Sequence, residues 1–219
     1  MRIYPIYHSG FFVELEERYL LFDYYRREIP RLDPEKPLYV FITHGHRDHC
    51  HPEIQSLTAY YQHRTFVGNG VKDPAFTRID PGQRLELDGV EITALDSTDR
   101  GVALLVRAEG RTIFHAGDLH LWYWDDDTPE ERKDMYRRYC AALAPLKGVV
   151  VDVAFLVLDS RQSDPDALMG IELFDRMVEP RHIIPMHYGD GAARMEARIP
   201  KLTCRDKVIN PRRITVYEL

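Results

Sequence analysis

Four histidines and two acidic residues lie within residues 41–53, FITHGHRDHCHPE, directly after an apolar run. His44 and His46 are two residues apart, so at the end of a strand their side chains point the same way. Asp48 and His49 follow after the chain has turned, and they face the same cavity from another direction. Imidazole and carboxylate groups are ordinary zinc ligands. The spacing therefore predicts two metals, the first held by the histidine pair and the second by the aspartate–histidine pair.

Two distant segments also place a ligand-type side chain at the end of an apolar run. Asp118 follows TIFHAG, where its carboxylate is suited to bridge two cations, and His187 follows IIPM. The alternative, a charged and solvated surface loop, does not need two distant partners of the same kind. The three segments together therefore favour a metal site.

The chemistry expected of such a site is hydrolysis by a metal-activated water. A bound metal lowers the pKa of its water from about 15.7 to about 7. We expect no covalent intermediate, because the chain has no GxSxG nucleophile motif. Asp48 is predicted to be the catalytic residue, both as a ligand and as the group that orients the nucleophile.

The segments that carry these residues are predicted to be strands. Residues 37–43, PLYVFIT, and residues 153–160, VAFLVLDS, are apolar runs typical of strands buried on both faces. Asp88-Gly89 and Glu109-Gly110 predict two hairpin turns. Strands are also expected near both ends of the chain.

Helices are expected between the groups of strands. A short helix is predicted over 52–63, and a longer one over 127–146 with a capping box that begins at Thr128. A third helix is predicted over 163–180, entered through Asp164 or Ser163. Strands followed by a helix, twice over, indicate two sheets face to face with helices outside. The predicted fold is therefore an α/β, four-layer αββα sandwich.

Length and composition set limits on function. The chain of 219 residues is expected to form a single domain over 1–219, with the 44% hydrophobic content of an ordinary globular protein. A net charge of -6 gives no overall basic field for a phosphate backbone, which disfavours nucleic acid as a partner. A small-molecule substrate is expected instead.

The cysteines and the length of the apolar stretches predict where in the cell the protein is located. Cys50, Cys140 and Cys204 are odd in number and widely spaced, which argues against disulfides and fits a reducing cytosol. The N-terminus has no apolar core of signal-peptide length, and no window approaches the roughly 20 apolar residues of a membrane span. We therefore expect a cytoplasmic protein with no membrane partner, and the oligomeric state stays open.

These motifs resemble those of a known superfamily. THGHRDH resembles the HxHxDH motif of the metallo-β-lactamase superfamily. HAGD, IPMHYGD and the early YHSGFFVEL are similar to segments of its single-domain bacterial metal-dependent hydrolases, a branch with sugar-phosphate-lactonase-like members. Across nearly the whole chain, the resemblance implies the αββα sandwich and a hydrolytic centre with one or two ions, usually Zn²⁺. The implied ligands are His44 and His46 for one metal, Asp48, His49 and His187 for the other, and Asp118 as the bridge.

One position departs from the family pattern. The family has a histidine where this chain has ITALDSTDRGVALLV. Asp96 occupies that position, Asp99 is nearly as good a candidate, and His115 can also reach inward. A carboxylate in place of an imidazole favours harder ions such as Mn²⁺ or Fe²⁺. The first metal site is therefore expected to be rich in oxygen ligands, weak or empty.

Four further residues are candidates for the substrate pocket, namely His8, His120, Asp159 and Arg161. Arg161 can hold a phosphate or carboxylate with two hydrogen bonds, and the alternative is an ordinary surface arginine. Residues 120–127, HLWYWDDD, form either a lid over the pocket mouth or anchors that pack the connection against the sheet. The anchor interpretation is favoured.

The predicted function is a metal-dependent hydrolase, with zinc as the expected ion, acting on a small ester, lactone or phosphodiester. Because this fold is shared by unrelated reactions, the choice among these substrates rests on analogy. Two alternatives stay open. One is a nuclease or RNA-processing phosphodiesterase, and the other is a metal-binding regulatory protein with weakened catalysis.

Overall fold

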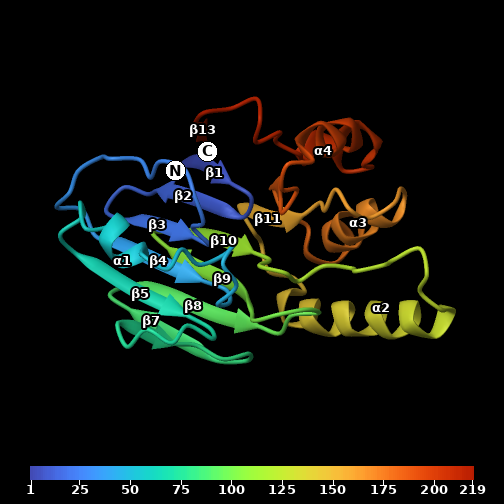
Figure 1. Cartoon of the computed structure of the whole chain (residues 1–219), viewed down its shortest axis with the longest axis horizontal. Helices are drawn as coiled ribbons and strands as arrows, with labels where there is room; N and C mark the ends of the chain where they lie inside the picture. The colour runs from blue at the N-terminus through green and yellow to red at the C-terminus, as the bar shows by residue number, and fades with distance from the viewer. The chain divides into compact units, whose positions relative to one another are not determined.

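The apolar runs of the sequence form two mixed sheets in the computed structural model, which describes residues 1–219 (Figure 1). The chain divides into two compact units, and each unit holds one sheet. Unit 1 comprises Met1–Asp80 and Pro211–Leu219, and unit 2 comprises Pro81–Asn210. The predicted α/β class is confirmed.

The sheet of unit 1 has seven strands in the order β13-β1-β2-β3-β4-β5-β6. Strands β1 to β3 pair antiparallel, and β3 to β6 pair parallel. The strands are β1 (Arg2–Tyr7), β2 (Gly10–Glu14), β3 (Tyr19–Phe22), β4 (Leu38–Ile42), β5 (Arg64–Gly68), β6 (Phe76–Arg78) and β13 (Tyr217–Glu218). Because β13 pairs with β1, the chain ends meet, and the Met1 amino group donates to the Leu219 carbonyl at 2.9 Å.

The central strand of unit 1, β4, lies within a packed core. All five residues of β4 are buried, as expected of a strand covered on both faces. The rings of Phe12, Tyr19 and Tyr61 pack together, with centroids 5.1–6.1 Å apart. Burial of one such ring stabilises the fold by about 1.5–3 kcal/mol. Helix α1 (Ile54–Leu57) is shorter than the predicted 52–63, and the Tyr61 hydroxyl donates to the Pro30 carbonyl beyond its end.

The sheet of unit 2 has six strands in the order β12-β11-β10-β9-β8-β7. The strands are β7 (Arg84–Leu87), β8 (Val90–Leu95), β9 (Ala103–Ala108), β10 (Arg111–His115), β11 (Val153–Val157) and β12 (His182–Met186). Both predicted hairpins are confirmed, because Asp88-Gly89 joins β7 to β8 and Glu109-Gly110 joins β9 to β10. All four turn residues have positive φ, which the tight two-residue turn requires. Strands β10, β11 and β12 pair parallel, so their carboxyl ends lie at one edge of the sheet.

Helices α2 (Pro129–Leu143), α3 (Asp166–Val178) and α4 (Ala192–Arg198) belong to unit 2. The capping box at Thr128 is confirmed. The predicted cap of α3 is wrong, because Pro165 precedes the helix without a side-chain cap. Asp164 instead accepts from Arg198 at 2.7 Å, and Ser163 donates to another loop. Short 3₁₀ turns cover Ala144–Leu146, Ile199–Lys201 and Arg205–Lys207. None of the helices has the length and apolarity that crossing a membrane requires.

Candidate metal centre

The histidine-rich loop of unit 1 begins directly after β4, as predicted. His44 is buried, and its ring centroid lies 4.6 Å from that of His46 and 4.2 Å from that of His49. Ligand nitrogens of His44 and His46 lie within 4.8 Å of each other. The end of β4 therefore brings the first predicted ligand pair together.

Gly45 separates these two histidines in the loop. Glycine at this point of a turn suggests a left-handed conformation, but Gly45 is not among the residues with positive φ. A Cβ built on Gly45 would lie 2.9 Å from the carbonyl oxygen of Gly70. Gly45 is therefore required because the loop passes close to the backbone of Gly70.

Asp23 is the residue of this group that sequence reasoning misses. Its carboxylate is fully buried at the end of β3, where it accepts from the Thr43 backbone N–H at 2.8 Å and from the Thr43 hydroxyl at 2.6 Å. Its Oδ2 lies 2.7 Å from His49 Nδ1. A carboxylate on Nδ1 fixes the tautomer and presents Nε2 to a cation, as in many histidine metal sites. The signal was present, because Asp23 follows the apolar run YLLF as Asp118 follows TIFHAG.

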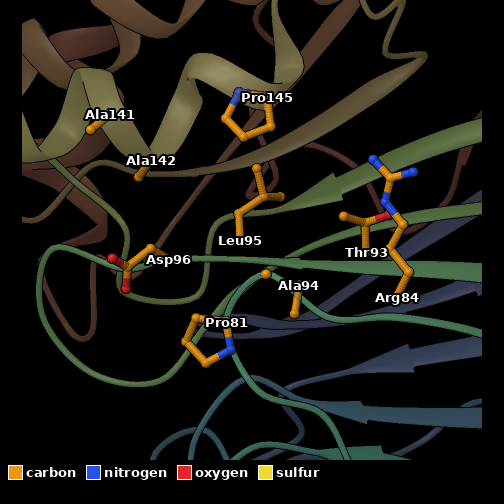
Figure 2. Close-up of a pocket in the computed structure, with 10 residues that line it drawn as sticks. Pro81, Arg84, Thr93, Ala94, Leu95, Asp96, Ala141, Ala142 and Pro145 are labelled. Atoms are coloured by element: carbon orange, nitrogen blue, oxygen red, sulfur yellow. The ribbon is translucent and has the colours of Figure 1, made fainter.

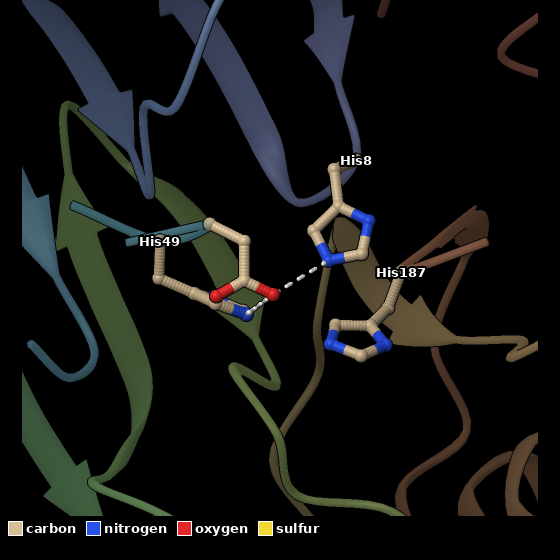
Figure 3. A group of neighbouring side chains, drawn as sticks. His8, His49 and His187 are labelled. Atoms are coloured by element: carbon tan, nitrogen blue, oxygen red, sulfur yellow. Dashed lines mark ion pairs between the residues drawn. The ribbon is translucent and has the colours of Figure 1, made fainter. Parts of the chain in front are cut away.

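His8 and Asp48 complete the group of unit 1 (Figure 3). His8 Nε2 lies 3.4 Å from Asp48 Oδ2, and the same oxygen lies 4.0 Å from His49 Nε2. Two ligands on one tetrahedral zinc, with bonds of about 2.0–2.1 Å, are separated by about 3.3–3.4 Å. The His8–Asp48 distance matches this separation. The neighbouring His8 imidazole holds the pKa of the Asp48 carboxyl well below its usual value.

Asp118 and His187 form the corresponding group of unit 2. Asp118 follows β10, His187 follows β12, and His187 Nε2 lies 3.4 Å from Asp118 Oδ1. The other ring nitrogen of His187 lies 3.0 Å from Asp159 Oδ2. Burial opposes ionisation of Asp159, but hydrogen bonds from His187 and Arg161 outweigh it and hold the pKa of that carboxyl well below its usual value. Asp159 therefore orients His187 in the way that Asp23 orients His49.

Three residues of these two groups have left-handed backbone conformations. His8 has φ 58°, Asp23 has φ 40° and His187 has φ 61°. Such values are uncommon for residues other than glycine and cost about 1–3 kcal/mol each. The surrounding packing must hold them in place, and strain of this kind is concentrated at functional sites.

Asp96 and Asp99, the candidates for the missing family histidine, are exposed on the loop after β8. Asp96 accepts from the Ser97 backbone N–H at 2.9 Å and lines a cavity of about 410 Å³ together with Arg84 (Figure 2). The buried residue of this loop is Thr98, whose hydroxyl donates to the His120 carbonyl at 2.6 Å. Thr98 therefore anchors this loop to the segment after Asp118. The carboxylates of Asp96 and Asp99 lie on the exposed side of the loop.

His115 and His120 are both buried within unit 2. His115 Nδ1 accepts from the Gly117 N–H at 3.1 Å, so this ring fixes the turn that leads to Asp118. His120 Nε2 lies 2.8 Å from the Gln162 side-chain oxygen, and a Cβ on Gly170 would lie 2.4 Å from the His120 ring. Burial lowers the pKa of His120 to about 4, so it is neutral at pH 7. Both histidines have packing partners that explain their positions.

Arg198 holds the loop that carries Asp159. It is the largest fully buried side chain in the chain, and its Nη1 donates to the Asp159 carbonyl at 2.6 Å. Its Nε donates to Asp164 at 2.7 Å, and its Nη2 donates to the Gln162 carbonyl. One guanidinium therefore fixes three points of the loop after β11.

Replacing Arg198 with methionine is expected to lower the free energy of unfolding by about 2–5 kcal/mol, because two buried carbonyls lose a charged donor. Chemical denaturation followed by circular dichroism measures this loss. Arg194 is exposed on the same helix, and Arg194→Met is the matched control, with an expected change within about 0.5 kcal/mol. Equal stability of the two variants would contradict the assigned role of Arg198.

Cys50 follows the motif but is not suited to be a nucleophile at neutral pH. It packs against the core of unit 1, and burial, together with the nearby carboxylates of Asp23 and Asp73, raises the pKa of its thiol to about 11. Burial likewise raises the pKa of Cys204 to about 11. We expect both cysteines to react with iodoacetamide at pH 8 roughly 100-fold more slowly than in the unfolded chain, with faster reaction as pH rises. Peptide mass spectrometry after timed labelling measures this, and rapid labelling of native Cys50 would contradict it.

Comparisons with known proteins show the family to which the chain belongs. The family model described as the beta-lactamase superfamily domain matches residues 2–133, which is more than half of the chain. A UPF0173 metal-dependent hydrolase of Methanopyrus kandleri is 26% identical over 86% of this chain and 84% of its own length. A UPF0173 metal-dependent hydrolase of Opitutus terrae is 29% identical over 87% of this chain and 86% of its own.

A solved structure shows the fold. A metallo hydrolase from the archaeon Ignicoccus hospitalis is similar with a TM-score of 0.65 and 16% identity, covering 100% of this chain and 98% of the other. The predicted metallo-β-lactamase-like fold is thereby confirmed. The family match, the ordered HxHxDH, Asp and His motifs and the fold lead to one conclusion: the chain belongs to the metallo-β-lactamase superfamily.

Proposed function

We propose that the protein is a metal-dependent hydrolase that acts on a small ester, lactone or phosphodiester and carries one or two zinc ions. The observation that supports this most directly is that a carboxylate fixes Nδ1 in two candidate ligands. Asp23 pairs with His49 within unit 1, and Asp159 pairs with His187 within unit 2. In each case the carboxylate fixes the ring so that Nε2 would be the ligand atom, which is how structural support for zinc-binding histidines is built.

The proposed ligands are His44, His46, Asp48, His49, Asp118 and His187. Their imidazole nitrogens and carboxylate oxygens are the donor set of a catalytic zinc site, and the 3.4 Å between His187 Nε2 and Asp118 Oδ1 matches the distance between neighbouring ligands. The bound metal supplies Lewis acidity and a water that reacts near neutral pH. Among the chain's own residues, Asp48 is proposed to orient the nucleophile, because its carboxylate lies 3.4 Å from His8 Nε2 and 4.0 Å from His49 Nε2.

His8 is proposed as an additional ligand beside Asp48 and His49. The ligand atoms of His8, Asp48 and His49 lie within 4.8 Å of one another, whereas Asp96 and Asp99 are exposed. We therefore leave the two loop aspartates out of the proposed ligand set. A ligand set with three or more imidazoles favours zinc, while Mn²⁺ and Fe²⁺ are the ions that added carboxylates would favour.

The test combines metal analysis with a substrate panel. Elemental analysis is expected to find one or two zinc ions per chain, and the thermal midpoint is expected to fall when EDTA removes them, because a ligand that binds only the folded state stabilises it. A panel of esters, lactones and phosphodiesters is expected to include at least one substrate whose hydrolysis stops with EDTA and returns with added zinc.

Other outcomes identify the alternatives. Full metal occupancy with no turnover of any substrate would indicate a metal-binding regulatory protein. Salt-sensitive binding and cleavage of RNA or DNA, with no turnover of small substrates, would indicate a nuclease. Absence of metal from protein grown with zinc, manganese and iron would contradict the proposed function altogether.

A further inference from the structure

Two tryptophans and an arginine form a flat, charged surface in unit 2, here called the platform (Trp122, Trp124 and Arg161). The two indoles stack with an interplanar angle of 12° and centroids 6.0 Å apart. Arg161 Cζ lies 5.9 Å from the Trp122 centroid and 5.8 Å from the Trp124 centroid. The Arg161 side chain is 64% exposed, and Trp124 is half-buried. The platform therefore presents a cation beside an aromatic ring to solvent.

The platform contacts the ligand group of the same unit directly. The indole N–H of Trp122 donates to the Asp118 carbonyl at 2.9 Å, and its ring meets that of His187 edge-on, with centroids 5.8 Å apart. Arg161 donates through Nε and Nη2 to Asp159, the carboxylate that orients His187. A molecule seated on the platform would therefore lie one indole ring away from two of the proposed ligands.

The platform is held rigidly, although its backbone has no regular secondary structure. Gln162 donates from its side-chain amide to the carbonyls of Leu121 and Tyr123 at 3.1 and 3.2 Å. The Arg132 guanidinium donates to the Trp124 carbonyl at 2.9 Å. Side chains thus satisfy the carbonyls of this segment, so it is preordered for binding rather than built as a moving lid.

We propose that the platform is the recognition subsite of the hydrolase and selects substrates that carry an anionic group on an aromatic ring. The ring stacks on the half-buried indole of Trp124, and the carboxylate or phosphate accepts hydrogen bonds from the Arg161 N–H groups that do not donate to Asp159. An arginine suits both parts, because a guanidinium stacks on aromatic faces and bonds to planar anions with fixed geometry. The proposal rests on the proposed function for its role in catalysis, whereas binding at the platform is measurable without turnover.

Intrinsic fluorescence reports on this surface selectively, because the chain has two tryptophans and both belong to the platform. The metal-loaded protein is titrated with benzoate, with phenyl phosphate, and with benzamide as the neutral counterpart of benzoate. We expect saturable changes with the two anions and a dissociation constant at least tenfold higher for benzamide, since the neutral amide loses the charge-assisted hydrogen bond to Arg161. The tighter of the two anions identifies carboxylate or phosphate as the group recognised.

Substitutions in the platform and a control elsewhere distinguish the loss of anion recognition from a general effect on the fold. Arg161→Met is expected to weaken binding of the preferred anion about tenfold or more, and Arg161→Lys less, because the charge is retained. Trp124→Phe is expected to weaken binding while Trp122 still reports it. Arg107→Met is the control, since Arg107 lies on β9 with only a 4.0 Å ion pair to Glu91. Its affinity is expected to be unchanged.

Three results would contradict the proposed recognition role of the platform. They are no saturable fluorescence change with either anion, equal affinity for benzoate and benzamide, or wild-type affinity in Arg161→Met. Each of these leaves the proposed function standing if EDTA-sensitive hydrolysis is observed. Saturable anion binding in a protein that holds metal but hydrolyses nothing would instead reject the proposed function. The two failures are therefore distinguishable.

Discussion

Replacing Asp118 with alanine is expected to reduce hydrolysis to the uncatalysed background and to lower the metal content of the purified protein. Asp118 is the proposed shared ligand, and its Oδ1 lies 3.4 Å from His187 Nε2. Loss of a group that only orients a ligand costs about 10–100-fold in metal affinity, so loss of a ligand costs more. Without the metal, the pKa of water returns to about 15.7, and reactive hydroxide at neutral pH becomes negligible. Elemental analysis and a rate assay with the best substrate of the panel measure both effects.

Asp99→Ala is the matched control for this prediction. Asp99 is exposed on the loop after β8, where its backbone N–H is 3.3 Å from the Ser97 hydroxyl. The same substitution there is expected to leave metal content and rate unchanged. If Asp99→Ala lost its metal and Asp118→Ala kept it, the missing family histidine would have been replaced by the loop carboxylate, and the proposed ligand set would be wrong.

Asp23→Asn is expected to weaken metal binding by about 10–100-fold and to lower the free energy of unfolding by about 2–4 kcal/mol. The carboxylate accepts from the Thr43 N–H and hydroxyl and orients His49, all without contact with solvent. An amide of the same size can present only one oxygen, so at least one of these buried donors loses its acceptor. Competition with a zinc chelator measures the affinity, and denaturation of the metal-free protein measures the stability.

Asp33→Asn makes the same chemical change at an exposed position of unit 1, and it is expected to alter stability by less than about 0.5 kcal/mol. Two results would be informative against the role of Asp23. Unchanged zinc affinity would show that Asp23 does not orient a ligand. Equal losses in metal-free and metal-loaded protein would show that Asp23 is purely structural.

The parts of the fold that could be predicted from the sequence depend on interactions within a few residues. The two hairpins follow from Asp-Gly and Glu-Gly pairs that adopt positive φ, and α2 begins where Thr128 and Glu131 cap it. The cap of α3 could not be predicted in the same way. Asp164 there has a stronger partner in Arg198, which lies 34 residues further along the chain, and such a partner is invisible to a local pattern.

The residues of the candidate site show the same difference between local and distant interactions. His44, His46, Asp48 and His49 form a local motif whose spacing alone indicates a metal. Asp23 is 26 residues from the histidine it orients, and Asp159 is 28 residues from His187. These supporting carboxylates become recognisable only when the strands that carry them are paired. For the same reason, the sequence predicts His8 only as a substrate-pocket residue, whereas in the structure its Nε2 lies 3.4 Å from Asp48 Oδ2.

The pairing of β13 with β1 has a consequence for synthesis on the ribosome. Unit 2 is a continuous stretch inserted between the two sequence segments of unit 1, so the outer edge of β1 emerges early and stays unpaired until residues 217 and 218 are translated. An unpaired strand edge is a site for unwanted pairing with other chains. The nascent protein must therefore carry the outer edge of β1 unpaired through the synthesis of the 130 residues of unit 2.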